Sequence, residues 1–109
     1  MYLVHLPFLL QFKDDMLAGR KRATSRTNKY GEVGDEFVAF GARFRFALVQ
    51  KVELGWVAYH AHNKEGFRLP SEFIAVWEKI HPCAGYIAAQ KVWYHEFERV
   101  KTVAQEEPA

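Results

Sequence analysis

The stretch FKDDMLAGRKRATSR, from Phe12 to Arg26, changes from helical to extended periodicity at a single glycine. Before that glycine, apolar residues recur at positions 8, 9, 12, 16 and 17, which is the spacing of one face of a helix. Gly19 stands where a left-handed residue would end this helix. After it, Arg22, Thr24 and Arg26 alternate with two small residues. We therefore predict a helix over 8–17, followed closely by a strand over 22–26 with a cationic face.

The rest of the chain is rich in extended patterns. These predict further strands over 2–6, 36–40, 43–52, 56–60 and 92–100. Gly41-Ala42 is short enough to join two of them in a tight hairpin. Pro70 opens a second helix, whose apolar stripe runs to His81. With loops over 28–34 and 62–67, this order predicts an α+β fold, a small β-barrel flanked by two or three helices.

Length and composition indicate one folded domain, since half of the 109 residues are hydrophobic. We expect the domain to cover residues 1–101 and a polar tail to cover 102–109. The lone Cys83 cannot form an internal disulfide, which favours a reducing, cytoplasmic compartment. We expect Cys83 to be a small buried residue. No apolar run approaches the roughly 18–20 residues that cross a bilayer, so no membrane association is expected.

The positive charge of the chain is concentrated in one part of the sequence. Residues 20–51 hold eight cations and three acids, although the whole chain carries a net charge of only +2. The stretches 19–31 and 39–52 contain no acid. If they lie side by side, they form a surface suited to phosphate, whereas the alternative is an ordinary solvated face. Tyr30 and Phe67, in predicted loops, are candidates for stacking on bases.

Four features in the order expected for one family follow each other along the chain. They are Gly19, Lys21, Thr24 and Arg26 at fixed spacing; Gly34-Asp35 opening a strand; Glu65-Gly66-Phe67; and a helix ending at His81-Pro82. Together they resemble the ASCH domain family, which belongs to the PUA-like group of small β-barrels. The resemblance implies RNA binding, and for some members a ribonuclease activity or the removal of acetyl groups from N4-acetylcytidine.

The resemblance to the acetylcytidine-cleaving members also implies a catalytic trio of Lys21, Thr24 and Glu65. A threonine hydroxyl is a poor nucleophile until a base takes its proton. Lys21 is the candidate base, because neighbouring cations and partial burial lower the pKa of a lysine. We assign Glu65 the role of orienting group or proton shuttle, and Arg26 that of donor to an oxyanion or a phosphate.

Strand geometry leaves two arrangements open. Side chains three residues apart, such as those of Lys21 and Thr24, point to opposite faces of a regular strand. A shared site requires Lys21 to lie before the strand, or a bulge between the two residues. If the strand is regular from Lys21 on, Arg22, Thr24 and Arg26 share one face and a phosphate-binding surface is the better interpretation.

We therefore predict first a module that binds RNA or a modified nucleoside in a basic cleft. Its predicted contact residues are Arg20, Arg22, Arg26, Arg43, Arg45, Tyr30 and Phe67. The alternative is a small hydrolase, an amidohydrolase or a ribonuclease, using Lys21, Thr24 and Glu65. No phosphate loop or dinucleotide fingerprint is present, and His60 and His62 lack an acidic or thiol partner at ligand spacing. We therefore predict no cofactor and no metal site.

Overall fold

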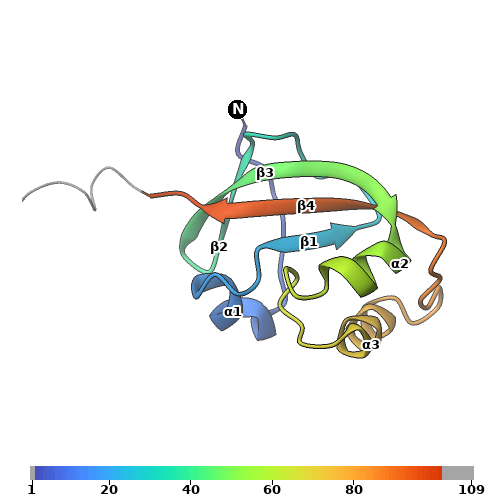
Figure 1. Cartoon of the computed structure of the whole chain (residues 1–109). Helices are drawn as coiled ribbons and strands as arrows, with labels where there is room; N and C mark the ends of the chain where they lie inside the picture. The colour runs from blue at the N-terminus through green and yellow to red at the C-terminus, as the bar shows by residue number, and fades with distance from the viewer. Residues whose placement is uncertain (1, 102–109) are drawn as a thin grey trace, which may run out of the picture.

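The computed structural model describes residues 2–101, so the predicted tail over 102–109 lies outside the described residues. The elements in chain order are η1 (Leu10–Phe12), α1 (Lys13–Leu17), β1 (Ala23–Arg26), β2 (Glu36–Ala39), β3 (Ala42–Glu53), α2 (Leu54–Trp56), η2 (Val57–Ala61), α3 (Pro70–Ile80) and β4 (Lys91–Arg99). Figure 1 shows the helices gathered below the sheet, with β1 as the strand nearest to them.

Four antiparallel strands form a single curled sheet in the described part of the chain, in the order β1-β4-β3-β2. The long strand β3 bends across the molecule, and the sheet closes half of a barrel (Figure 1). A shift of register between Phe46 and Leu48 accompanies the bend. The predicted α+β class is confirmed, as is the barrel-like curvature. β1 ends the sheet and has one free edge.

The turn between β2 and β3 lies one residue earlier than predicted. Phe40 (φ 54°) and Gly41 (φ 78°) form the two-residue connection, while Ala42 already belongs to β3. In a type I′ hairpin turn, which matches the twist of the strands, both central residues have positive φ. Glycine adopts this conformation freely, whereas Phe40 adopts it at a cost.

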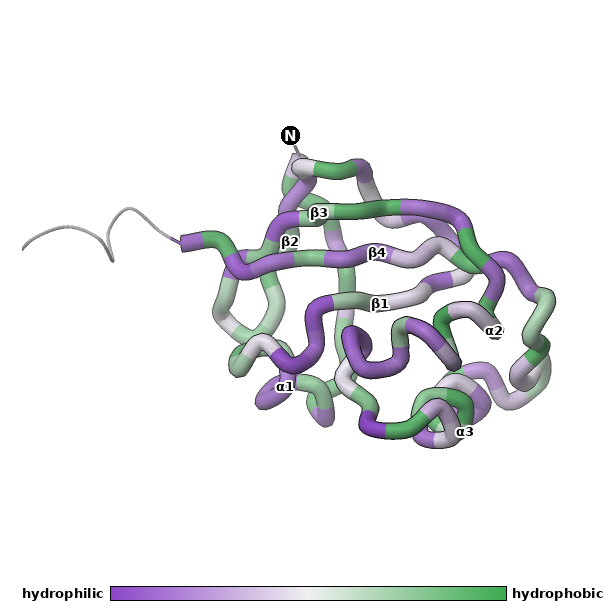
Figure 2. Tube along the Cα trace, in the orientation of Figure 1, coloured by the Kyte–Doolittle hydropathy of each residue, from purple (hydrophilic) through white to green (hydrophobic). Residues whose placement is uncertain are grey.

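Two hydrophobic clusters form the core, one at each end of the sheet. The first joins β1, β4, α2, η2 and α3, through Ala23, Leu54, Val57, Ala58, Ala61, Phe73, Trp77, Val92 and Tyr94. The second joins the N-terminal segment, α1, β2, β3 and β4, through Leu6, Phe12, Met16, Phe37, Ala42, Phe44, Phe46 and Phe97. Phe67 packs against both. Figure 2 shows hydrophobic residues interspersed with hydrophilic ones along β3 and β4.

The predicted strand over 56–60 is wrong, because this segment is helical. The buried residues Leu54, Val57, Ala58 and Ala61 recur at helical spacing, and all four pack into the first cluster. The apolar period of the segment is therefore that of a helix. η2 is a turn of π-helix, a form that occurs often at functional sites.

The predicted strand over 2–6 is reduced to a single parallel bridge between Leu3 and Glu36. The predicted first helix begins only at Leu10, as a short 3₁₀ turn that leads into α1. Within residues 2–101, no helix combines the length and the apolar character needed to cross a membrane.

The second cluster depends on Phe37, which is fully buried and packs against the rings of Phe8, Phe44, Phe46 and Phe97. We expect Phe37→Ala to lower the free energy of unfolding by about 3–5 kcal/mol, because it leaves a cavity among these rings. Urea unfolding followed by circular dichroism measures this loss. Val38→Ala is the matched control, since Val38 is the next residue and is 54% exposed. Equal unfolding midpoints for the two variants would contradict this account of the core.

Candidate functional site

A cavity of about 370 Å³ lies where the two hydrophobic clusters meet. One end is polar, formed by Lys21, Thr24, Ser25, Arg26 and Glu65, and the walls include the rings of Phe8, Phe12, Tyr30, Phe67, Phe73 and Trp77. We name it the Lys21 cavity. Phe12 belongs to the second cluster and Phe73 to the first, so the cavity occupies the seam between them.

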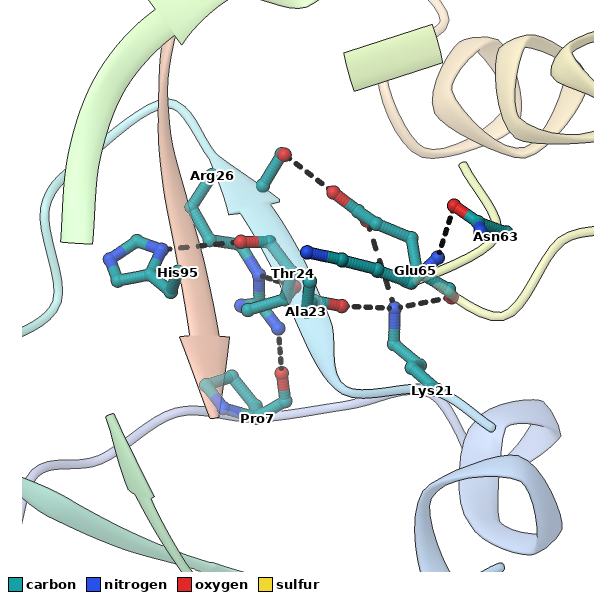
Figure 3. Close-up of polar contacts among 10 residues, drawn as sticks. Pro7, Lys21, Ala23, Thr24, Arg26, Asn63, Glu65 and His95 are labelled. Atoms are coloured by element: carbon teal, nitrogen blue, oxygen red, sulfur yellow. Dashed lines mark hydrogen bonds and ion pairs between the residues drawn. The ribbon is translucent and has the colours of Figure 1, made fainter. Parts of the chain in front are cut away.

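Lys21 is buried at the polar end, and its amine meets three oxygen atoms. Nζ donates to the backbone carbonyls of Ala23 (3.0 Å) and Glu65 (2.9 Å), and lies 3.7 Å from Oε1 of the Glu65 carboxylate. Figure 3 shows these contacts joining β1 to the segment that carries Glu65. Nζ also lies 4.5 Å from the centre of the Phe12 ring. The amine thus binds two parts of the chain that are distant in sequence.

Lys21 lies before β1, which begins at Ala23. The structure therefore meets the condition that allows Lys21 and Thr24 to share a site. The backbone N–H of Lys21 donates to the carbonyl of Asp15 at the end of α1, which fixes the chain as it leaves the helix. Both side chains line the Lys21 cavity.

The segment 62–66 follows η2 and is held against the free edge of β1. The N–H of Arg22 donates to the carbonyl of Lys64 at 2.7 Å. Gly66 has φ +97°, and a Cβ atom there would lie 3.1 Å from Cβ of Lys21. Only glycine therefore combines this backbone conformation with so close an approach to Lys21.

Glu65 is buried and receives a second hydrogen bond from a residue that the sequence analysis did not select. The Ser25 hydroxyl donates to Oε2 of Glu65 at 2.5 Å. The two carboxylate oxygens are thus divided between Lys21 and Ser25. Alternation along β1 placed Ser25 with Ala23, away from Thr24. The prediction missed that a cavity at the free edge of a strand receives side chains from both of its faces.

Thr24 and Arg26 form a second polar group in the cavity. Nε of Arg26 donates to the Thr24 hydroxyl oxygen at 3.0 Å, and its Nη2 donates to the carbonyl of Pro7 at 2.7 Å (Figure 3). The guanidinium lies 4.9 Å from the ring of Phe8 and 5.5 Å from that of Tyr30. Arg26 has no ion pair with an acid among residues 2–101.

Burial lowers the pKa of Lys21 from 10.5 to about 8, because the ammonium loses its hydration. The positive charge of Arg26 acts in the same direction, while Glu65 and Asp15 oppose it. Burial also lowers the pKa of Arg26. A buried lysine with so low a pKa, beside a carboxylate in a cavity, marks a candidate functional site.

Comparison with known proteins finds no matching family model and no match among curated proteins. Several solved structures superpose on the chain, and three of them are described in turn. One is the ASCH domain from Lactobacillus crispatus JV V101, with a TM-score of 0.65 and 16% identity over 90% of this chain and 78% of that one. The chain has an ASCH-like fold.

Two further structures agree with this assignment. The hypothetical protein PH0355 has a TM-score of 0.68 and 13% identity, over 92% of this chain and all of that one. Protein EF3133 from Enterococcus faecalis V583, described as DUF984, has a TM-score of 0.63 and 17% identity, over 97% and 80%. The resemblance found in the sequence is confirmed at the level of the fold, and identities this low say nothing about activity.

Four of the predicted contact residues lie outside the Lys21 cavity of this ASCH-like fold. Arg20 is exposed and pairs with Asp15, and Arg22 is exposed beside a shallower depression. Arg43 and Arg45 both pair with Glu36 of β2, at 2.6 and 2.7 Å. Glu36 thus neutralises part of the basic face that the acid-free stretch 39–52 suggested. Tyr30 and Phe67 do line the cavity.

His95 lies on β4 and contacts two residues that line the cavity, Tyr30 and Thr24. It is fully buried, its Nε2 accepts the N–H of Tyr30 at 3.2 Å, and its Nδ1 lies 3.3 Å from the carbonyl of Thr24. Burial lowers the pKa of His95.

Cys83, expected to be buried, is exposed. No group of three or more potential metal ligands occurs within residues 2–101.

The close approach of Gly66 to Lys21 leads to a testable prediction. Gly66→Ala and Gly34→Ala should each cost about 1–2 kcal/mol of stability, because both glycines have positive φ, +97° and +95°. Only Gly66→Ala should also shift the NMR signal of a ¹³Cε-labelled Lys21, since nothing lies within 4 Å of a Cβ at Gly34. An unchanged Lys21 signal in Gly66→Ala would contradict the packing described.

The charge balance at Lys21 leads to a second prediction. The Lys21 signal should titrate with a pKa of about 8 in the wild type. Glu65→Gln should lower this pKa further, because Glu65 is the main group that raises it. Glu96→Gln, which removes a carboxylate paired with Lys64, is the matched control and should leave it unchanged. A Lys21 pKa near 10.5 in the wild type would refute the buried environment.

Proposed function

We propose that the protein is a small hydrolase that takes a nucleoside-sized ligand into the Lys21 cavity and cleaves an acyl group from it. The observation that carries the proposal is the burial of Lys21, Glu65 and two hydroxyl side chains at one end of this cavity. Such a concentration of buried polar groups is costly to stability, and active sites are where it is commonly retained.

The cavity supports binding of a single small, partly aromatic ligand. Its volume of about 370 Å³ falls in the roughly 300–1,000 Å³ range of small-molecule sites, and most of its wall is aromatic or aliphatic. A nucleobase has two flat faces that stack on such rings. The same space accepts one base of an RNA strand, so the free nucleoside and the RNA-borne base are both candidate substrates.

The polar end supports acyl transfer. Lys21 and Glu65 provide groups that accept or hold a proton, and the two hydroxyls provide nucleophiles. Arg26, held by Thr24 and Pro7 and without an acidic partner among the described residues, provides donors for a developing oxyanion. N4-acetylcytidine, the substrate class that the sequence resemblance implies, combines a flat base with an acyl amide.

A second candidate function is RNA binding without catalysis. It is favoured by Arg26, whose guanidinium lies near the rings of Phe8 and Tyr30 and has no acidic partner within residues 2–101. Such an arginine suits a phosphate or a stacked base. The arginines outside the cavity support it less, because Arg20, Arg43 and Arg45 are paired with acids.

Incubation with N4-acetylcytidine, and separately with an acetylated single-stranded RNA, tests the proposal by chromatography of the deacetylated product. We expect turnover by the wild type and a loss of about 10²-fold or more in Lys21→Ala. Arg43→Ala, which removes an arginine outside the cavity, should stay within about twofold. If neither sample reacts, while RNA is retained in a salt-sensitive complex that Arg26→Ala weakens, the binding function is correct and the hydrolase is not.

A further inference from the structure

Two hydroxyl side chains, Thr24 and Ser25, line the polar end of the Lys21 cavity. They are adjacent in sequence, and both are buried. We propose that Ser25, and not Thr24, is the nucleophile, with Glu65 as its base and Lys21 as the group that orients Glu65. This inference rests on the hydrolase proposed above and assigns its catalytic residues.

The two hydroxyls differ in whether they donate a hydrogen bond to a base, which a nucleophile requires. Ser25 donates its proton to Oε2 of Glu65 at 2.5 Å. Thr24 accepts a hydrogen bond from Nε of Arg26, and no hydrogen bond joins its hydroxyl to Lys21 or Glu65 in the described part of the chain. A hydroxyl attacks only when a base within hydrogen-bonding reach takes its proton. Ser25 meets this requirement, whereas Thr24 does not.

Lys21 suits the role of orienting group better than that of base. An ammonium has three N–H donors, and three oxygens surround Nζ, from Ala23 and from the backbone and carboxylate of Glu65. In its charged form, with hydrogen bonds to two backbone carbonyls and an ion pair with Oε1 of Glu65, the amine has no lone pair to accept a proton. Lys21 pairs with Oε1 of Glu65, and Oε2 remains free to accept the proton of Ser25. The three residues thus match the usual arrangement of a nucleophile (Ser25), a base (Glu65) and a group that orients the base (Lys21).

The step balances with these residues alone and water. Oγ of Ser25 attacks the acyl carbon, and its proton passes to Oε2 of Glu65. Collapse of the tetrahedral intermediate breaks the carbon–nitrogen bond, and the leaving amine takes that proton. Water then attacks the Ser25 ester and gives a proton to Glu65, which returns it to Oγ as the carboxylic acid leaves. No oxidant, reductant or metal is required.

Arg26 completes the arrangement from the neighbouring position on β1. Its guanidinium is fixed by the Thr24 hydroxyl and the Pro7 carbonyl. Thr24 therefore acts as a positioning residue for Arg26, the group available to stabilise the oxyanion. This explains why both hydroxyls are found at one site although only one of them contacts a carboxylate.

Two variants and one trapping experiment test the assignment with N4-acetylcytidine as the probe. We expect Ser25→Ala to lose at least about 10³-fold in turnover, and Thr24→Val, which removes the other hydroxyl and its bond to Arg26, to lose about 10²-fold or less. Wild-type protein quenched during turnover should carry one acetyl group. Both residues lie in the tryptic peptide 23–26, so fragmentation of that peptide must place the acetyl group on Ser25.

The possible results separate the two proposals. An acetyl group on Thr24, or a Ser25→Ala variant as active as the wild type, would overturn the assignment while the hydrolase stands. Absence of turnover in the wild type would overturn the hydrolase and the assignment together. The trapping experiment uses the wild-type protein, so it does not depend on the folding of any variant. Circular dichroism of Ser25→Ala shows whether this variant is folded, in which case its loss of activity reflects the missing hydroxyl.

The pH profile gives an independent readout. Asp15 from α1, Arg26 from β1 and Glu65 from the segment 62–66 surround Lys21, whose pKa is about 8. If charged Lys21 orients Glu65, turnover is highest below this pKa and falls as pH rises through about 8. If neutral Lys21 were the base for Thr24, turnover would instead rise through the same range. A rising profile would therefore overturn the role given to Lys21.

Discussion

The buried contact between Lys21 and the segment 62–66 is the interaction on which the site depends. It joins the entry to β1 with the segment that follows η2, across a separation of 44 residues. Taking a charged amine out of water is costly, and here three oxygens offset the cost in part, as the lowered pKa of Lys21 indicates. Removing one member of such a buried pair typically costs about 3–5 kcal/mol, because the other is left without a partner.

The two hydrophobic clusters explain why a cavity remains at this place. Each cluster packs on its own end of the curled sheet, and Phe67 is among the side chains that contact both. Apolar residues cannot fill the remaining seam without covering Lys21, Glu65 and Arg26, whose polar atoms would then lose access to a ligand or water. The buried polar groups and the separation of the two hydrophobic clusters therefore both keep the Lys21 cavity open.

Much of this arrangement could be predicted from the sequence, because it depends on local patterns. The helix, glycine and strand between Phe12 and Arg26 define the position of Lys21, and alternation in β3 correctly places Phe44 and Phe46 in the core. The pairing of Arg43 and Arg45 with Glu36 was missed for a different reason. It depends on the register between β2 and β3, which the hairpin turn fixes, and the predicted turn lay one residue too late. The segment 56–60 was predicted as a strand, although the buried residues from Leu54 to Ala61 recur at helical spacing.

The position of β1 at the edge of the sheet explains why Ser25 escaped prediction. Alternation assigns neighbouring residues to opposite faces, and in a central strand Thr24 and Ser25 would point into separate environments. The free edge of β1 instead borders the segment 62–66, whose Glu65 reaches the Ser25 side of the strand, while Arg26 lies with Thr24 on the other. A cavity that wraps around this edge receives groups from both faces. An edge strand can thus bring the hydroxyl and guanidinium groups of two adjacent residues, Ser25 and Arg26, to one cavity.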